Sequence, residues 1–214
     1  MEFLDEAIET FVEKHTKPES DVLADLNRET YAKVLMPRML SGHIQGKALE
    51  TFSHMIRPRR ILEIGTYTGY SAICLASGMT DDGLLHTIDI NEELQPMVNQ
   101  YIARAGMEKK IKMHIGPALE VISWLDEVFD LVFIDADKEN YSEYFDAVFD
   151  KVRPGGFIIA DNVLWSGKVL DDVKDQDEET KALSAYNEKI MKDDRVDNVL
   201  LPIRDGLMVA RKLS

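Results

Sequence analysis

RILEIGTYTGYS, residues 60–71, joins a short apolar run to a glycine-containing turn and then to a helical pattern. This order is typical of the first strand, loop and helix of an α/β unit that binds a nucleotide-like ligand at the loop. Gly65 and Gly69 would let the backbone turn and approach a ligand closely. Tyr67 stands where a dinucleotide-binding loop has its middle glycine, and its side chain would obstruct a pyrophosphate, which disfavours NAD.

Further apolar runs follow this unit and alternate with helical patterns, at the spacing of parallel βαβ units. We expect these strands at residues 61–64, 85–90, 111–115, 131–134 and 157–160, the last of them following Pro154-Gly155-Gly156. Asp205-Gly206, between apolar runs at 196–203 and 207–210, is a strong signal for a β-hairpin. The sequence therefore predicts an α/β fold with a seven-stranded, mostly parallel sheet, a C-terminal antiparallel hairpin and helices on both faces.

The N-terminal region has the spacing of amphipathic helices. Apolar residues recur every three or four positions at Phe3, Leu4, Ala7, Ile8 and Phe11, and the pattern resumes at 22–26 after a break at Pro18. We expect residues 1–57 to form a helical lid or brace over an α/β core of residues 58–214, within a single domain of residues 1–214.

The composition excludes several classes of function. A formal net charge of −14 across 214 residues disfavours broad adhesion to nucleic acids or anionic membranes. The single cysteine, Cys74, lies in an apolar run and is predicted to be a buried packing residue, which fits a reducing compartment. No apolar stretch approaches the roughly 20 residues needed to span a bilayer, and the acidic N-terminus is unlike a secretory signal. We expect a cytoplasmic protein with no membrane partner.

Oxygen-bearing side chains end two of the predicted strands. Asp135 follows one strand, and Asp161 and Asn162 follow the next. Because neighbouring strands lie about 5 Å apart and α/β proteins bind ligands at the carboxyl ends of their strands, these residues can converge. Each alone is more often a cap or turn residue. As a set without histidine or cysteine they favour Mg²⁺ over Zn²⁺, although Mn²⁺ and Ca²⁺ accept the same oxygen ligands.

Several motifs occur in order and at matching spacing from Met39 to Lys212: ILEIGTYTGYSA, TIDI (87–90), GPAL (116–119), FIDADKENY, DNVLWSGKV (161–169) and a late DGL. Together they resemble the cation-dependent O-methyltransferases, which include the catechol and caffeoyl-coenzyme A O-methyltransferases. The resemblance implies the Rossmann-like class I methyltransferase fold, S-adenosylmethionine as the methyl donor and a divalent cation. The C-terminal hairpin also favours this version over a plain dinucleotide-binding fold.

Acidic residues near the glycine loop suit S-adenosylmethionine, which carries a sulfonium and an ammonium group. Glu63 offers a carboxylate beside the loop, and Asp89, about 20 residues further on, is placed to accept hydrogen bonds from ribose hydroxyls. Asp89 could instead be a helix N-cap, although Asn91 could cap equally well. The other cofactor-binding candidates that the loop and the resemblance imply are Met39, Ser41, Gly65, Thr66, Tyr67, Gly69, Ser71, Ala118, Asp135 and Asp137. Met39 could alternatively be a core residue, and Ser41 a helix cap.

Lys138 matches the lysine of the family's Asp-x-x-Lys element and is the candidate general base, with Asp135 as the other catalytic candidate. A bound cation lowers the pKa of a phenolic hydroxyl and orients its oxygen, so methyl transfer needs mainly alignment and deprotonation. An ammonium group beside a divalent cation also gives up its proton more easily. The alternative for Lys138 is a solvated or ion-paired lysine. Asp137 could either steer the cofactor or pair with Lys138.

The expected acceptor is a small aromatic diol. Mg²⁺ keeps several waters, which leaves positions for the two oxygens of a catechol. Trp165 and Ser166 begin a loop that could cover the acceptor, and Trp165 could equally be a packing residue. The acidic segment 171–180 is interpreted as a mobile, solvated loop, and it disfavours a phosphate-rich coenzyme A ester. Ser166 also departs from the asparagine of the plant caffeoyl-coenzyme A enzymes.

Two other functions stay open at this point. Some bacterial relatives methylate a modified uridine in transfer RNA, which the net charge disfavours unless a dimer assembles a basic groove. A non-catalytic module that binds S-adenosylmethionine is the third possibility, and the intact set Asp135, Lys138, Asp161 and Asn162 is evidence against it. Apolar faces on the N-terminal helices and the terminal hairpin, together with the family's frequent dimerisation, lead us to expect a homodimer.

Overall fold

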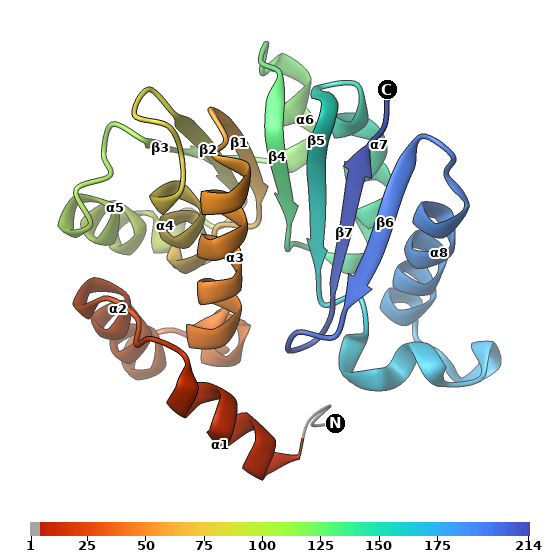
Figure 1. The fold of residues 1–214 in the computed structure, drawn as a ribbon, viewed down its shortest axis with the longest axis horizontal. Coiled ribbons are helices and arrows are strands. Elements are labelled where there is room, and N and C mark those ends of the chain that lie inside the picture. Colours follow the sequence, from red (N-terminus) through yellow and green to blue (C-terminus); the bar gives the residue numbers. More distant parts are fainter. Residues whose placement is uncertain (1–4) are drawn as a thin grey trace.

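The computed structural model describes residues 5–214, so Phe3 and Leu4 of the predicted helical pattern lie outside the described residues. A seven-stranded sheet forms the centre of the molecule, with helices on both faces (Figure 1). Its order is β3-β2-β1-β4-β5-β7-β6. The strands are β1 (Arg60–Ile64), β2 (Leu84–Asp89), β3 (Ile111–Ile115), β4 (Phe129–Ile134), β5 (Val152–Asp161), β6 (Val196–Leu201) and β7 (Leu207–Lys212). The predicted sheet is confirmed, because β1 to β5 pair in parallel and β7 runs antiparallel to both β5 and β6.

Some of the helices begin at a residue whose side chain caps them. Ser20 accepts a hydrogen bond from the backbone of Leu23, and Pro18 separates the first two helices as the break in the pattern predicted. Within residues 5–214, no helix has both the length and the apolar character that a membrane crossing requires. The α-helices are α1 (Glu6–His15), α2 (Asp21–Lys33), α3 (Gly42–Ile56), α4 (Tyr70–Ser77), α5 (Gln95–Arg104), α6 (Ala118–Trp124), α7 (Tyr141–Phe149) and α8 (Glu178–Lys192). Short 3₁₀ turns lie at η1 (Pro37–Met39), η2 (Glu92–Leu94), η3 (Lys138–Asn140), η4 (Trp165–Leu170) and η5 (Val173–Asp175).

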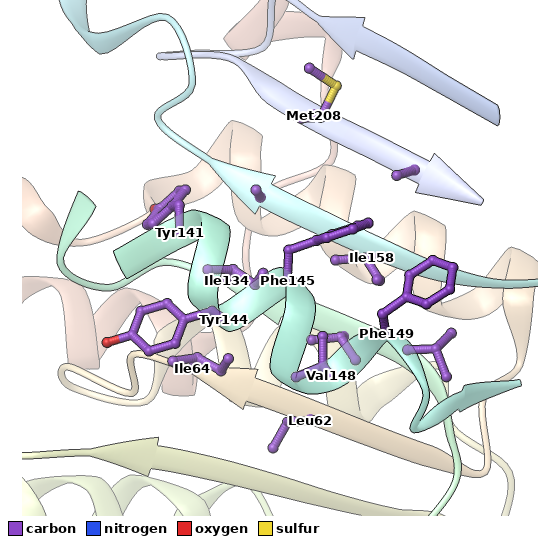
Figure 2. Close-up of a cluster of buried hydrophobic side chains, with 14 of the residues drawn as sticks. Leu62, Ile64, Ile134, Tyr141, Tyr144, Phe145, Val148, Phe149, Ile158 and Met208 are labelled. Atoms are coloured by element: carbon purple, nitrogen blue, oxygen red, sulfur yellow. The ribbon is translucent and has the colours of Figure 1, made fainter. Parts of the chain in front are cut away.

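Both faces of the sheet are buried, as is usual for parallel strands between helices. One apolar layer, which includes Val132 and Ile134 of β4, packs against α6, α7 and α8, and Figure 2 shows part of it. The opposite layer includes Leu131 of the same strand and packs against α2 to α5. Cys74 of α4 is fully enclosed in this second layer, which confirms the prediction that it is a packing residue. Burial of each large apolar side chain stabilises the fold by roughly 1.5–3 kcal/mol.

Strand β5 is longer than the sequence predicted. The expected strand began at Phe157, because Pro154-Gly155-Gly156 was interpreted as a break, whereas β5 begins at Val152 and contains those residues. Phe129 pairs with Val152 but Leu131 pairs with Phe157, so the extra residues bulge out of the ladder. Gly155 has a φ of +74°, a backbone conformation open to glycine, and this lets the strand continue through the bulge.

Candidate active site

A deep cleft lies at the carboxyl ends of the central strands, where the chain order reverses between β1 and β4. In open α/β sheets this reversal is the usual place for a ligand. The cleft has a volume of about 1730 Å³, larger than the 300–1,000 Å³ typical of a site for one small molecule. The predicted site residues that line it are Met39, Ser41, Gly65, Thr66, Tyr67, Ser71, Asp89, Ala118, Asp135, Asp137, Lys138, Asn162, Trp165 and Ser166. Glu63, Gly69 and Asp161 are buried behind this surface.

The glycine loop crosses tightly over the end of β4. Gly65 has a φ of +100°, and a Cβ atom there would lie 1.8 Å from the carbonyl oxygen of Asp135. Any side chain at this position would therefore collide with backbone. The two strand ends are also joined by a hydrogen bond of 2.8 Å from the amide of Asp135 to the carbonyl oxygen of Ile64. Gly65 thus serves the packing of the two loops against each other as well as the opening of the cleft.

Asp89 holds the glycine loop in place. Its Oδ2 atom accepts hydrogen bonds from the backbone amides of Thr66 at 3.1 Å and Tyr67 at 2.7 Å. The N-cap of the following turn is Asn91, whose side chain accepts from the amide of Glu93 at 3.0 Å, so the alternative assignment of Asp89 as that cap is wrong. Its Oδ1 atom accepts a hydrogen bond of 2.8 Å from the amide of Asn91. The carboxylate lines the cleft and so keeps one lone pair for a ligand hydroxyl.

Glu63 is a fully buried carboxyl group behind the loop. Its Oε2 atom accepts a hydrogen bond of 2.5 Å from the hydroxyl of Thr87, and its Oε1 atom has no protein partner. Burial away from water raises the pKa of Glu63 to about 8. A cationic ligand group nearby would supply the missing partner and favour the ionised form. The cradle therefore fits a positively charged ligand better than a pyrophosphate.

Two residues of the N-terminal segment lie on the rim of the cleft. The side chain of Met39 is 57% exposed, so the alternative that it is a core residue is wrong. Ser41 precedes α3 at its N-cap position, but its side chain makes no capping hydrogen bond. Both side chains are thus available to a ligand in the cleft.

Asp135, Asp161 and Asn162 come together at the ends of β4 and β5. Asp161 is 1% exposed, and its Oδ1 atom accepts a hydrogen bond of 2.7 Å from the amide of Asn162. Burial and the nearby charge of Asp135 raise the pKa of Asp161 to about 7. Within residues 5–214 no group of three or more histidine, cysteine, aspartate and glutamate side chains could hold a metal, so a cation here would also need the amide oxygen of Asn162. Two close carboxylates and an amide oxygen fit a hard divalent cation.

Lys138 is buried among these oxygens. Its Nζ atom donates hydrogen bonds to Asp135 Oδ1 at 3.1 Å, to Asn162 Oδ1 at 2.9 Å and to the hydroxyl of Tyr141 at 2.6 Å. The lysine is therefore ion-paired with Asp135 and is not solvated. Asp137 does not pair with Lys138, because its carboxylate accepts instead from the hydroxyl of Tyr144 and the amide of Asn140.

The segment that follows Asn162 forms one wall of the cleft. Asn162, Trp165 and Ser166 all have positive φ angles, between 49° and 59°, so the chain turns sharply here. The amide of Ser166 donates a hydrogen bond of 2.5 Å to Asp205 Oδ1, in the turn between β6 and β7. Trp165 both lines the cleft and packs against the core layer under α7, so the two interpretations of this residue are compatible.

The acidic segment 171–180 is mostly exposed, as a solvated segment would be, and it contains η5 and the first residues of α8. Asp177 caps α8 by accepting a hydrogen bond of 2.8 Å from the amide of Thr180, and it also forms an ion pair with Lys168. Gln176 is buried and donates a hydrogen bond to the carbonyl oxygen of Asp171. The sequence showed the charge of this segment but not these local partners.

The sequence model of the O-methyltransferase family matches residues 13–213. The chain belongs to this family. Caffeoyl-CoA O-methyltransferase 5 of Nicotiana tabacum is 33% identical over 201 residues, which cover 87% of this chain and 82% of that protein. An O-methyltransferase from Bacillus cereus, solved in complex with SAH, superposes with a TM-score of 0.88 at 30% identity, covering 96% of this chain and 97% of its own. TomG from Streptomyces achromogenes, solved in complex with SAM, superposes with a TM-score of 0.89 at 27% identity. The superposition covers 97% of this chain and 96% of TomG.

Three residues of this O-methyltransferase reach the site without having been predicted as site residues. The hydroxyl of Tyr141 donates a hydrogen bond of 3.0 Å to the carbonyl oxygen of Asp161 while it accepts from Lys138. Arg204 donates to the carbonyl oxygens of Ser41 and Arg38, at 3.0 and 2.7 Å. Tyr141 lies within the FIDADKENY motif, which was a usable signal. Arg204 lies between the two predicted hairpin strands and had no further prediction. The third residue, Gln45, donates a hydrogen bond from its side-chain amide to Asp161, and no sequence pattern indicated this contact.

Proposed function

We propose that this O-methyltransferase transfers a methyl group from S-adenosylmethionine to one hydroxyl of a small catechol-like acceptor, with the help of a divalent cation. The observation that carries the proposal is the placement of Asp135, Asp161 and Asn162 at the adjoining ends of β4 and β5. There the amine of Lys138 bonds oxygens of Asp135 and Asn162 on the wall of the cleft. Membership of the O-methyltransferase family supplies the reaction class.

The cofactor would occupy the part of the cleft under the glycine loop and supply the methyl group. Solved relatives hold SAM or SAH, which supports the same ligand here. Asp89 fixes the loop and offers its one remaining lone pair to a ribose hydroxyl. Glu63, whose pKa is raised to about 8 by burial, would ionise beside the positive charge of the cofactor. Ala118 lines the cleft past the end of β3, where its small side chain leaves room for the adenine.

Asp135, Asp161 and Asn162 would hold the cation, with Mg²⁺ the first choice and Mn²⁺ or Ca²⁺ also compatible. When bound, the cation would lower the pKa of an acceptor hydroxyl and fix the position of its oxygen. Lys138 is 6% exposed, so its amine is shielded from bulk water. The Tyr141 hydroxyl holds that amine in place, and we assign to Lys138 the acceptance of the hydroxyl proton.

The acceptor is proposed on the chemistry of the cleft. The matched tobacco relative is named for caffeoyl-CoA. In this chain Glu179 and Asp205 line the cleft on the acceptor side, and they would repel the phosphates of coenzyme A. An uncharged aromatic diol avoids this repulsion and can stack on Trp165. We also propose that the protein is a homodimer and is located in the cytoplasm. Each chain would be a single domain in which the N-terminal segment, assigned to residues 1–57, acts as the lid.

Methylation of transfer RNA is not favoured, because the net charge of −14 opposes nucleic-acid binding. A non-catalytic role is also not favoured, because the catalytic set is intact in this chain. Each of these two functions predicts a binding or turnover result that differs from that of the main proposal. A tRNA enzyme would bind tRNA with a steep salt dependence, and a non-catalytic module would bind S-adenosylmethionine without turnover.

The test is methyl transfer to a panel of catechols, with product mass as the measurement. The purified protein receives S-adenosylmethionine and either Mg²⁺ or an excess of chelator. We expect a product 14 mass units heavier, on the order of one methylene, only when Mg²⁺ is present. Asp161→Asn, which keeps the size of the side chain but removes its charge, should lose the Mg²⁺ response while cofactor binding persists. Turnover that survives the chelator would contradict the cation requirement.

A further inference from the structure

Gln45 of α3 reaches across the molecule to Asp161. Its side chain is 1% exposed, and its Nε2 atom donates a hydrogen bond to Asp161 Oδ2, although 116 residues separate the two in sequence. Gln45 does not line the cleft surface and so does not touch a ligand there. It contacts the site from behind, through one of the proposed cation ligands.

The approach of α3 depends on the residue after Gln45. A Cβ atom at Gly46 would lie 2.5 Å from Cε1 of Tyr70 and 3.0 Å from Sγ of Cys74, so only glycine lets α3 lie this close to α4. Helix α4 is in turn continuous with the glycine loop. The position of the Gln45 amide is therefore set by rigid, buried packing and not by the side chain alone.

Hydrogen bonds hold both oxygens of the Asp161 carboxylate. Its Oδ1 atom accepts from the amide of Asn162, and its Oδ2 atom accepts from Gln45. Each carboxylate oxygen retains a further lone pair. The Oε1 atom of Gln45 is buried without a partner, and turning the amide over would place that oxygen against the carboxylate. Toward the ionised carboxylate, which is the form that would bind a cation, the side chain therefore acts as a donor.

We propose that Gln45 is a positioning residue for the divalent cation: it holds the Asp161 carboxylate so that its remaining lone pairs face Asp135 and Asn162. The inference rests on the proposed cation-dependent function and extends it to a helix outside the strand ends. Partners that orient a metal ligand typically change metal affinity by about 10- to 100-fold when they are removed. Gln45 also links the N-terminal helices to the site, since α3 follows directly on the segment that forms the rim of the cleft.

Gln45→Met removes the donor and keeps the length of the side chain, and Gln45→Asn keeps the amide but shortens it so that it no longer reaches Asp161. The measurement is Mn²⁺ binding by titration, with free Mn²⁺ followed by electron paramagnetic resonance, and SAH binding by calorimetry. We expect both variants to bind Mn²⁺ about 10- to 100-fold more weakly than the unaltered protein, with unchanged SAH affinity. The matched control is Ser53→Ala, which removes a buried donor on the same helix that bonds the carbonyl oxygen of Leu75.

The outcomes separate the two proposals. An unaltered protein that binds SAH but no Mn²⁺ would overturn the cation-dependent function itself. Mn²⁺ binding that is equal in the unaltered protein and in both Gln45 variants would overturn only the positioning role. An equal loss of Mn²⁺ affinity in Ser53→Ala, accompanied by a lower melting temperature without Mn²⁺ in all three variants, would also overturn it, because the effect would then belong to α3 as a whole.

Discussion

The Nζ atom of Lys138 lies 2.9 Å from Oδ1 of Asn162. The same nitrogen lies 3.1 Å from Oδ1 of Asp135, so the lysine shares two oxygens with the proposed cation site. An ammonium group and a divalent cation repel each other strongly at such short range. The amine that is proposed to accept the acceptor's proton is therefore also a competitor for the ligands of the cation.

Replacing Lys138 with methionine should separate these two effects. We expect Lys138→Met to abolish methyl transfer and to tighten Mn²⁺ binding by up to about 10-fold, because one competing positive charge is removed. Mn²⁺ titration and turnover of a catechol check the two parts independently. Lys168→Met, at a half-exposed lysine paired with Asp177, should change neither. Weaker Mn²⁺ binding by Lys138→Met would show that the lysine supports the cation site and does not compete with it.

A substitution at Gly65 tests the close crossing of the two strand ends. Gly65→Ala would place its Cβ atom 1.8 Å from the carbonyl oxygen of Asp135, so we expect a loss of at least about 3 kcal/mol in the free energy of unfolding. Gly42→Ala is the matched control, because Gly42 has a φ of +74° but no atom within 4 Å of the added carbon. It should cost only about 1–2 kcal/mol of backbone strain. Urea unfolding of both variants gives the comparison, and equal losses would contradict the steric argument.

Asp205 should govern the acceptor side of the cleft. Asp205→Ala removes the acceptor of the Ser166 amide and frees a segment with several strained residues. We expect KM for a catechol to rise by about 10-fold, with SAH affinity unchanged, because about 1.4 kcal/mol of positioning is lost. Asp205→Asn retains a side-chain oxygen and should have the smaller effect. A rise in KM for S-adenosylmethionine instead would place the defect at the cofactor.

A buried histidine pair should make stability fall in mild acid. His86 Nδ1 lies 2.8 Å from His114 Nε2, and burial, together with the neighbouring histidine, lowers the pKa of His114 to about 4. The unfolded chain binds a proton near pH 6.5 but the folded chain does not, so stability is lost as pH falls from 6.5 to 4 and levels off below. The loss is up to about 3 kcal/mol.

Urea unfolding across this pH range checks the prediction. His114→Gln should flatten the difference between pH 7 and pH 4.5, since glutamine takes up no proton. His54→Gln, at an exposed histidine of α3, should follow the unaltered protein. A pH dependence that is the same in all three proteins would assign the acid sensitivity to the carboxylates and not to the pair.

The sheet was predictable because its strands are short apolar runs with clear boundaries. The meeting of Asp135 with Asp161 followed from the same logic, since the ends of adjacent parallel strands lie side by side. The extension of β5 was missed because Pro154-Gly155-Gly156 resembles a terminator, whereas Gly155 accommodates a bulge. A local pattern does not distinguish these two uses of glycine.

The residues behind the site were not predictable, for a different reason. The bond from Gln45 to Asp161 depends on how α3 docks on α4, which in turn depends on the absent side chain at Gly46. Neither the spacing of residues in the sequence nor their type indicates how closely two helices pack against each other. Asp89 shows the intermediate case, because its position at the strand end was predicted and its bonds to the loop amides were not.

The bonds from Arg204 to the carbonyl oxygens of Arg38 and Ser41 join segments that are made at very different times during synthesis. On the ribosome, the segment of Arg38 and Ser41 emerges early. It cannot bond Arg204 until the hairpin of β6 and β7 has left the exit tunnel. A chain that is released before that point has the glycine loop and the aspartates but lacks the hydrogen bonds of Arg204 to the rim. The order of translation thus delays these two bonds until both of the segments that they join have been made.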